Sequence, residues 1–193
     1  MTMLAAVADV KKDIGIPVED TSKDDVLAAW IEAASHVVET YAHRLFSLSE
    51  RTENFEGGLK NLVVSAYPVA SVKSVVADGK AVEGYVVDSE RGIVHLKEGF
   101  GSRRGASGYE VQITYTGGFA EADMPSAVKM AARVLARRLY ESADDEGQLV
   151  QAEKLGDYSI TYAKYSVKDD ASGLGVFCPA AALLIKSVSG RGF

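Results

Sequence analysis

The sequence predicts an α+β protein in which a small helical bundle carries an inserted antiparallel β subdomain. Two stretches, residues 22–45 and 126–141, place apolar residues at the three- and four-residue spacing of one helical face. Between them, short segments alternate apolar and polar residues and are separated by glycine, proline and Asp-Gly turns. An amphipathic helix depends on a partner for its apolar stripe. The two helices are therefore expected to pack together, with the β residues as an excursion between them.

The first two predicted helices are marked by signals at their ends. An N-terminal helix over residues 2–14 has Thr2 as a cap at its beginning and Gly15 as a left-handed cap at its end. The long helix 22–45 begins with Ser22 and Asp25 in a capping-box pattern. Its apolar stripe includes Trp30, which we expect to be buried within the subunit.

The middle of the chain predicts short strands. We expect them over residues 51–55, 59–65, 72–77, 85–88, 93–96 and 109–116. Asp78-Gly79 is a dipeptide suited to a primed hairpin turn. Pro68 interrupts the pairing, because proline cannot donate a ladder hydrogen bond. Strands and turns at these intervals predict a compact, antiparallel, meander-like sheet.

Three elements follow the β residues. Pro125 suits the first position of helix 126–141, residues 156–163 alternate as a strand, and Pro179 starts a short C-terminal helix over residues 180–188. The predicted organisation is a helical core of residues 1–50 and 120–193, which includes a C-terminal arm. The inserted β subdomain takes residues 51–119.

The composition limits the possible partners. The net charge is -6 with no long basic run, which argues against a chain that seeks nucleic acid or an anionic membrane. We expect no signal peptide, and no apolar run reaches the roughly 20 residues of a membrane span. The single cysteine, Cys178, excludes an intrachain disulfide and is expected to be a small buried hydrophobe.

The sequence carries no recognisable motif for catalysis, a cofactor or a metal. His36 and His43 are seven residues apart on one predicted helix, too far to chelate one ion, and His95 belongs to another segment. HExxH, CxxC, EF-hand and GxSxG patterns are absent from the sequence. We therefore expect a chain that is not an enzyme, with no catalytic residues, no cofactor and no metal.

The loop of residues 99–108 is glycine-rich and contains Arg103 and Arg104. It lacks the Lys-Ser/Thr ending and the following helix of a phosphate-binding loop. Two interpretations stay open. The loop is either a long flexible hairpin connection, or a contact loop whose arginines bind carboxylates or phosphate when a partner arrives.

An ordered set of segments resembles the head–tail connector (adaptor) proteins of long-tailed bacteriophages. The set comprises a helix ending in DIGI, DDVLAAWIEAASHVVETYAHRLF, NLVVSAYPVASVKSVVADGKAV, GIVHL with YEVQITYTGGF, MPSAVKMAARVLARRLYE and EKLGDYSITYA. The resemblance covers nearly the whole chain. It depends on the order of the segments, because each segment alone is weakly specific.

The resemblance implies a structural virion protein of the neck, assembled in the cytoplasm of the host bacterium and without a catalytic site. Such proteins form a homo-oligomeric ring, usually a dodecamer, beneath the portal protein of the filled capsid. The ring joins the portal to a stopper or tail-completion protein. DNA passes through its channel without sequence-specific binding, and no membrane contact is implied.

A ring needs head-to-tail contacts, so each subunit must carry two unlike and complementary patches. The candidate interface residues are basic or acidic: Arg103, Arg104, Arg133, Arg137, Arg138, Asp144, Asp145 and Glu146. Of these, the basic group at 133–138 and the acidic group at 144–146 are candidates for the two patches. The negative net charge also suits a channel through which DNA slides, because a basic lining binds phosphates.

Two alternatives stay open. The first is another phage neck or tail-completion protein, which only the identity of its partners separates from a connector. The second is a small-ligand-binding or enzymatic α+β domain, with loop 99–108 closing a pocket. That alternative needs a concave site with convergent polar groups.

Overall fold

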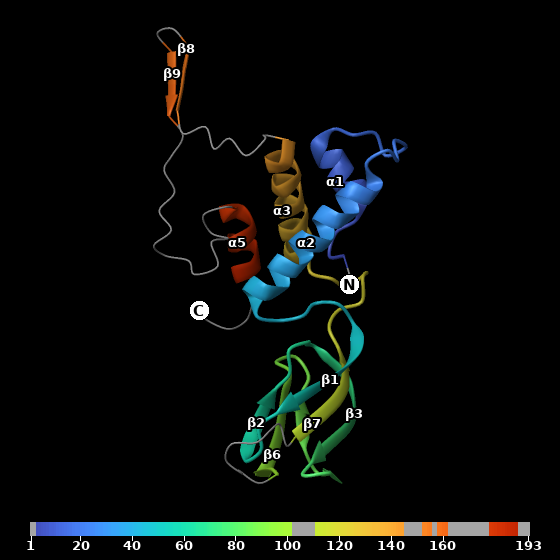
Figure 1. Ribbon diagram of the computed structural model, residues 1–193. Helices are drawn as coiled ribbons and strands as arrows, with labels where there is room; N and C mark the ends of the chain where they lie inside the picture. Colours follow the sequence, from blue (N-terminus) through green and yellow to red (C-terminus); the bar gives the residue numbers. More distant parts are fainter. Residues whose placement is uncertain (1–2, 102–110, 145–151, 156–157, 162–177, 189–193) are drawn as a thin grey trace. The chain divides into compact units, whose positions relative to one another are not determined.

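The structure is a computed structural model that describes residues 3–101, 111–144, 152–155, 158–161 and 178–188 (Figure 1). Its contacts divide the chain into two compact units, which we describe separately. The helical unit comprises Met1–Ala42 and Pro125–Phe193, and the β unit comprises His43–Met124. The predicted α+β class is confirmed. The domain limits expected at residues 50/51 and 119/120 stay a prediction.

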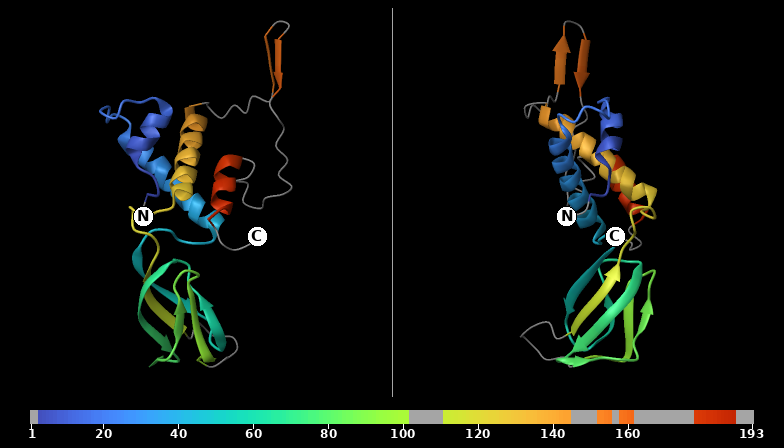
Figure 2. Two further views of the ribbon diagram at one scale, coloured as in Figure 1. Left: turned by 180° about the vertical axis from the view of Figure 1, so that it is seen from behind. Right: turned by 90° about the vertical axis from the view of Figure 1, so that its right-hand side faces the viewer.

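The described part of the helical unit contains four helices. They are α1 (Val7–Ile14), α2 (Asp24–Ala42), α3 (Ser126–Asp144) and α5 (Pro179–Lys186). α3 contacts both α2 and α5, and α1 packs against α2 and α3 (Figures 1 and 2). The apolar stripes meet in this centre, where fully buried side chains include Leu27, Ile31, Val128, Leu135 and Ile185.

The N-terminal helix is shorter than predicted. α1 begins at Val7, and Ala6 before it has an extended backbone without a side-chain cap. Leu4 donates its N–H to Ser35 Oγ of α2 at 2.9 Å, so this donor connects two elements instead of entering a helix. The predicted end is confirmed, because Gly15 adopts a left-handed φ of 75° and its N–H bonds back to the last turn.

The long helix α2 is also shorter than the predicted 22–45. The expected capping box is not formed: Ser22 donates its N–H to Asp20 Oδ1 at 3.0 Å, and the helix begins at Asp24. The helix ends at Ala42, because His43 has a left-handed φ of 50°. The chain then continues into the β unit.

Trp30 is mostly but not fully buried, so the prediction that it is buried holds only in part. The buried face of α2 runs through Leu27, Ile31, Ala34 and Val38. Trp30 lies at the edge of that face, because neighbouring residues are about 100° apart around a helix with 3.6 residues per turn. The apolar stripe read from the sequence is therefore wider than the surface that the unit covers.

The later helices agree with the predicted positions, with two differences at their ends. α3 continues to Asp144, beyond the predicted end at residue 141. The Pro125 carbonyl accepts the N–H groups of Val128 and Lys129, so this proline precedes the first helical residue instead of occupying it. Pro179 is the first residue of α5, as predicted.

A short hairpin follows α3 in sequence. β8 (Ala152–Leu155) pairs antiparallel with β9 (Tyr158–Thr161), with Leu155 opposite Tyr158. The predicted strand 156–163 corresponds to β9, whereas β8 was not predicted.

The described residues of the β unit form two antiparallel sheets, with strand orders β1-β7-β3-β4 and β2-β6-β5. The strands are β1 (Ser49–Phe55), β2 (Leu59–Val63), β3 (Val69–Ala77), β4 (Lys80–Ala81), β5 (Val86–Asp88), β6 (Ile93–Phe100) and β7 (Val111–Gly117). Their inward side chains form one apolar core with members from both sheets, including Leu62, Val94, Val75, Ile113 and Tyr115.

The order of the strands differs from a meander. β7 pairs with β1 on one side and with β3 on the other, although both strands are distant from β7 along the chain. Its alternate residues Val111, Ile113 and Tyr115 are all buried, so one face of this central strand packs on the core. The turn at Asp78-Gly79 is confirmed, with φ of 51° and 74° between β3 and β4.

Candidate assembly interface

The first predicted interface residue, Arg133, is engaged inside the helical unit. Its Nε and Nη2 donate to the two carboxylate oxygens of Asp13 at 3.0 and 2.6 Å. This bidentate pair joins α3 to the end of α1, and both side chains are about three-quarters buried. The hydrogen bonds to Asp13 raise the pKa of the Arg133 guanidinium. Arg133 therefore holds the helices together, and its role toward a partner stays a prediction.

The next two basic residues lie on the exposed side of α3. Arg137 Nε donates to Glu141 Oε1 at 2.6 Å, one helical turn further along. This hydrogen bond raises the pKa of the Arg137 guanidinium. Arg138 is exposed as well. An exposed pair at this spacing contributes little to stability, so a partner can compete for Arg137 at small cost.

The remaining predicted residues cannot be placed against these arginines. Arg103, Arg104, Asp145 and Glu146 lie outside the described residues. Asp144 is the last residue of α3. The expected pairing of a basic 133–138 patch with an acidic 144–146 patch therefore remains a prediction.

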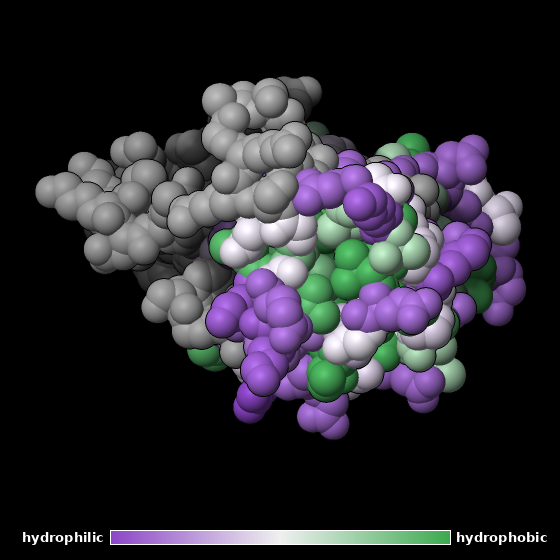
Figure 3. Space-filling view, turned by 90° about the horizontal axis from the view of Figure 1, so that it is seen from below, coloured by the Kyte–Doolittle hydropathy of each residue, from purple (hydrophilic) through white to green (hydrophobic). Residues whose placement is uncertain are grey.

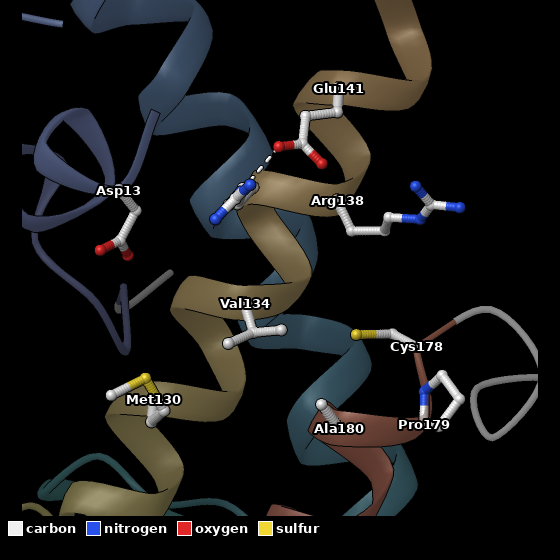
Figure 4. A pocket seen from close by; sticks show the side chains of 9 residues that line it. Asp13, Met130, Val134, Arg138, Glu141, Cys178, Pro179 and Ala180 are labelled. Carbon is white, nitrogen blue, oxygen red and sulfur yellow. Dashed lines mark hydrogen bonds and ion pairs between the residues drawn. The ribbon is translucent and has the colours of Figure 1, made fainter. Parts of the chain in front are cut away.

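A groove lies beside these arginines on the surface of the helical unit (Figure 4). Its volume is about 490 Å³, and α1, α3 and the beginning of α5 supply its walls. Apolar side chains form its floor, and charged groups stand at one end. The lining residues are Asp13, Met130, Val134, Arg137, Arg138, Glu141, Cys178, Pro179 and Ala180. Figure 4 shows α2 passing behind α3, so the groove opens on the side of α3 away from α2.

The described residues of the groove do not form a set of acid–base groups typical of catalysis. Asp13 is bound to Arg133, and Arg137 is bound to Glu141. Cys178 is buried, as predicted for a small hydrophobic residue. Among the residues that the structure describes, no group of three or more His, Cys, Asp or Glu side chains lies close enough to hold a metal ion. No described helix is both long and apolar enough to cross a membrane.

The last turn of α1 is also fixed by a buried charge. The side chain of Lys11 is 2% exposed, and its Nζ forms an ion pair with Asp24 Oδ1 at the beginning of α2. The same Nζ donates to the Val18 carbonyl at 3.1 Å. Together with the Arg133–Asp13 pair, this contact sets the position of α1, which forms one wall of the groove.

In the β unit, a cluster around Arg44 joins the segments by which the chain enters and leaves. The guanidinium carbon lies 3.5 Å from the centre of the Tyr67 ring and 4.8 Å from that of Phe46. Arg44 also donates to the Tyr67 carbonyl. Phe119 donates its N–H to the Phe46 carbonyl at 2.6 Å, and Leu48 donates to the Phe119 carbonyl. These contacts bind residues 44–48 to residue 119.

Apolar side chains are exposed on the β unit too. Figure 3 shows a face on which hydrophobic residues form a continuous group bordered by hydrophilic ones. The large exposed hydrophobic residues of the described β unit are Leu48, Leu59, Val63 and Val86. Exposed apolar groups of this kind are candidate contact surfaces, but the described part of the β unit does not indicate what would cover them.

The order of these elements agrees with one protein family. The model of the head completion protein family matches residues 3–148, which span α1, α2, the β unit and α3. The chain belongs to the head completion protein family. This membership confirms the resemblance to head–tail connector proteins and identifies a structural protein of phage-like particles. The match ends before α5, so the third wall of the groove lies outside it.

Two solved structures contain a chain whose fold is similar to that of this head completion family member. A chain in the neck of an empty gene transfer agent particle, computed with C6 symmetry, has a TM-score of 0.56 and 19% identity. A chain in the virion of a native gene transfer agent particle has a TM-score of 0.54 and 19% identity. Both comparisons cover 72% of this chain and 78% of the other. No curated protein matches the sequence.

The sequence contained a signal for one contact that we did not predict, the ion pair of Lys11 with Asp24. Lys11 lies on the apolar face that Val7, Val10 and Ile14 trace, where an unpaired charge is unfavourable. An acidic partner was therefore to be expected. The groove gave no such signal, because its walls come from residues as far apart in the chain as Asp13 and Ala180 and only packing brings them together.

The buried Tyr115 offers a test of the hydrogen bonding inside the β unit. The Tyr115 hydroxyl donates to the Glu53 carboxylate and accepts the Ala66 N–H at 3.0 Å. Burial, and then the hydrogen bond to Glu53, raise the pKa of Tyr115 to about 12. Because the folded-state pKa lies above the unfolded value of 10.0, this stabilisation is complete below pH 10 and is lost as the pH rises toward 12.

We expect Tyr115→Phe to destabilise the chain by about 1–3 kcal/mol at pH 8, because the Ala66 N–H then lacks its partner. The difference from the wild type should shrink above pH 10. The measurement is urea denaturation at several pH values, with the tyrosinate absorbance titrated in parallel. One of the nine tyrosines should titrate late in the folded wild type and be missing from the variant. Identical late titration in both proteins would contradict the assignment.

Proposed function

We propose that this chain is a head–tail connector (adaptor) of a phage-like virion. Copies of it form a homo-oligomeric ring, a dodecamer, in the neck. The ring joins the portal of the filled capsid to a stopper or tail-completion protein and surrounds the DNA channel. Assembly takes place in the cytoplasm of the bacterial host. The role is structural and involves no enzymatic step and no sequence-specific binding of DNA.

The observation that carries this proposal is the family match over residues 3–148. A protein that completes heads must contact an already assembled head, and the portal is the symmetric opening of that head. The similar chain from the gene transfer agent particle belongs to a neck computed with C6 symmetry, which supports a ring of six subunits or a multiple of six. The likeness to that chain, at 19% identity, concerns the fold.

The described surfaces also favour a structural role over the ligand-binding or enzymatic alternative. In the groove, Asp13 is ion-paired with Arg133, and Arg137 with Glu141, so these carboxylates are not poised for acid–base chemistry. A ring subunit needs two unlike surfaces, and head-to-tail contacts form a ring when the rotation between copies divides a full turn and involves no translation along the axis. The net charge of -6 is compatible with a channel that lets DNA slide.

The test is co-sedimentation of the purified full chain with portal rings encoded in the same genome, followed by negative-stain imaging. We expect stoichiometric binding to one end of the portal and a ring with a central channel. A parallel sample with the major capsid protein alone serves as the control. A chain that remains monomeric and does not bind portal rings at any ratio would overturn the proposal.

A further inference from the structure

α2 presents an uncharged, partly apolar stripe that the described helical unit does not cover. Val26 is 52% exposed, Ala33 and Val37 are exposed, and Trp30 is partly exposed. Their spacing of four, three and four residues places them along one line on the helix surface. This line lies beside the buried stripe of Leu27, Ile31, Ala34 and Val38. α2 is therefore apolar over two adjacent faces, but only one of them is buried in the unit.

The exposed edges of α2 and α3 carry opposite charges. α2 contains Asp24, Asp25, Glu32 and Glu39 and no lysine or arginine. α3 contains Lys129, Arg133, Arg137 and Arg138 against two carboxylates. Asp25 and Glu32 are exposed on α2, and Arg137 and Arg138 are exposed on α3. α2 thus offers an apolar ridge with an acidic edge.

The groove offers the complementary surface. Its floor is apolar, with Met130, Val134 and Cys178. Arg137 and Arg138 stand at its charged end together with Asp13 and Glu141, and these two carboxylates are already paired with Arg133 and Arg137. On α5, Leu183 is 72% exposed about one turn after Ala180. An apolar floor beside basic side chains fits an apolar ridge beside carboxylates. The groove opens on the side of α3 away from α2, so one subunit can use both surfaces at the same time (Figure 4).

We infer that the outer face of α2 in one subunit occupies the groove between α1, α3 and α5 of a second copy of this chain. The contact is head-to-tail, because the two surfaces are different and lie on different sides of the helical unit. Repeated with a rotation that divides a full turn, it closes a ring. The inference rests on the proposed function and specifies the surface by which its ring is formed. It also assigns Arg137 and Arg138 to α2 of the neighbour instead of to the acidic residues 144–146.

The first experiment substitutes Val26→Asp in the full chain and measures the number of copies bound per portal ring. We expect roughly a ten-fold or greater loss of ring assembly, because the variant places a charge in the apolar contact. Ala81→Asp, at an exposed position of the β unit outside its exposed apolar group, is the matched control and should assemble normally. Circular dichroism checks that both variants are folded. A folded Val26→Asp variant that assembles like the wild type would overturn the inference.

The second experiment uses charge reversal and mixing. Asp25→Lys with Glu32→Lys forms one variant, and Arg137→Glu with Arg138→Glu forms the other. Each variant alone should assemble poorly, because like charges then face each other across every contact. An equal mixture should recover assembly to an intermediate level, since contacts that join a reversed α2 to a reversed groove pair opposite charges again. No recovery on mixing would overturn the pairing of α2 with the groove.

The outcomes separate this inference from the proposed function. If the wild type does not bind portal rings, the proposed function fails. If the wild type forms rings and the α2 variants do so equally well, the inference alone fails. If the α2 variants bind no portal even as single copies and mixing restores nothing, the stripe contacts the portal, which also overturns the inference.

Discussion

Gly117→Ala is expected to unfold the β unit. Gly117 ends β7 between β1 and β3, opposite Ser49 and Val69. A Cβ atom there would collide with the backbone carbonyl oxygen of Ala66 and lie 2.8 Å from a ring carbon of Tyr115. Neither group can move away easily, because the Ala66 N–H is bound to the Tyr115 hydroxyl. We therefore expect a loss of about 4 kcal/mol or more, in the range reserved for severe core clashes.

The measurement is hydrogen–deuterium exchange of peptides from residues 43–124, with urea denaturation as a second observable. Protection of β3 and β7 should be lost. Gly84→Ala is the matched control: Gly84 also lies in the β unit, has a φ of 79°, and has space for a Cβ atom, which would meet no heavy atom within 4 Å. It should be destabilised only by the strain of an alanine in a left-handed conformation, about 1–2 kcal/mol. Equal protection in Gly117→Ala and the wild type would contradict the predicted clash.

Asp24→Asn is expected to destabilise the helical unit by about 3 kcal/mol, because it leaves the Lys11 charge buried with one carbonyl partner. The Lys11 side chain is 2% exposed, whereas that of Asp24 is 37% exposed. Lys11→Met should therefore be much milder, since it removes the buried charge and leaves a carboxylate that water can reach. The double variant should be more stable than Asp24→Asn alone.

Urea denaturation followed by the fluorescence of Trp30, the single tryptophan, measures these changes in α2 itself. Asp25→Asn is the control, because Asp25 shares the first turn of α2 and is exposed. It should lose only the interaction with the helix dipole, about 0.5 kcal/mol. If Asp24→Asn and Asp25→Asn have the same effect, the buried ion pair contributes nothing.

The position of α1 links this stability to assembly. α1 is held by Lys11 at one point and by Asp13 at another, and Asp13 also lines the groove. A destabilised α1 therefore changes a wall of the surface that we assign to the neighbouring copy. Asp24→Asn is expected to reduce ring assembly as well as stability, although Asp24 does not line the groove.

The sequence by itself determined most of the helices and strands and indicated the family. Periodicity located α2 and α3, Gly15 and Pro179 marked helix ends, and Asp78-Gly79 indicated the hairpin between β3 and β4. These features are local, since a helix face or a turn is specified within a few residues. The order of segments also led to the head–tail connector resemblance, because order is a property of the chain alone.

Only the tertiary structure decided which surfaces remain exposed and which charges are used inside the unit. The sequence showed one wide apolar stripe on α2 and one basic run on α3. Packing divided the stripe into a buried face with Leu27 and an exposed line with Val26, and it turned Arg133 inward to Asp13. The central place of β7 and the groove depend on contacts between residues far apart in the chain. Such contacts follow from how faces fit together, which no local pattern contains.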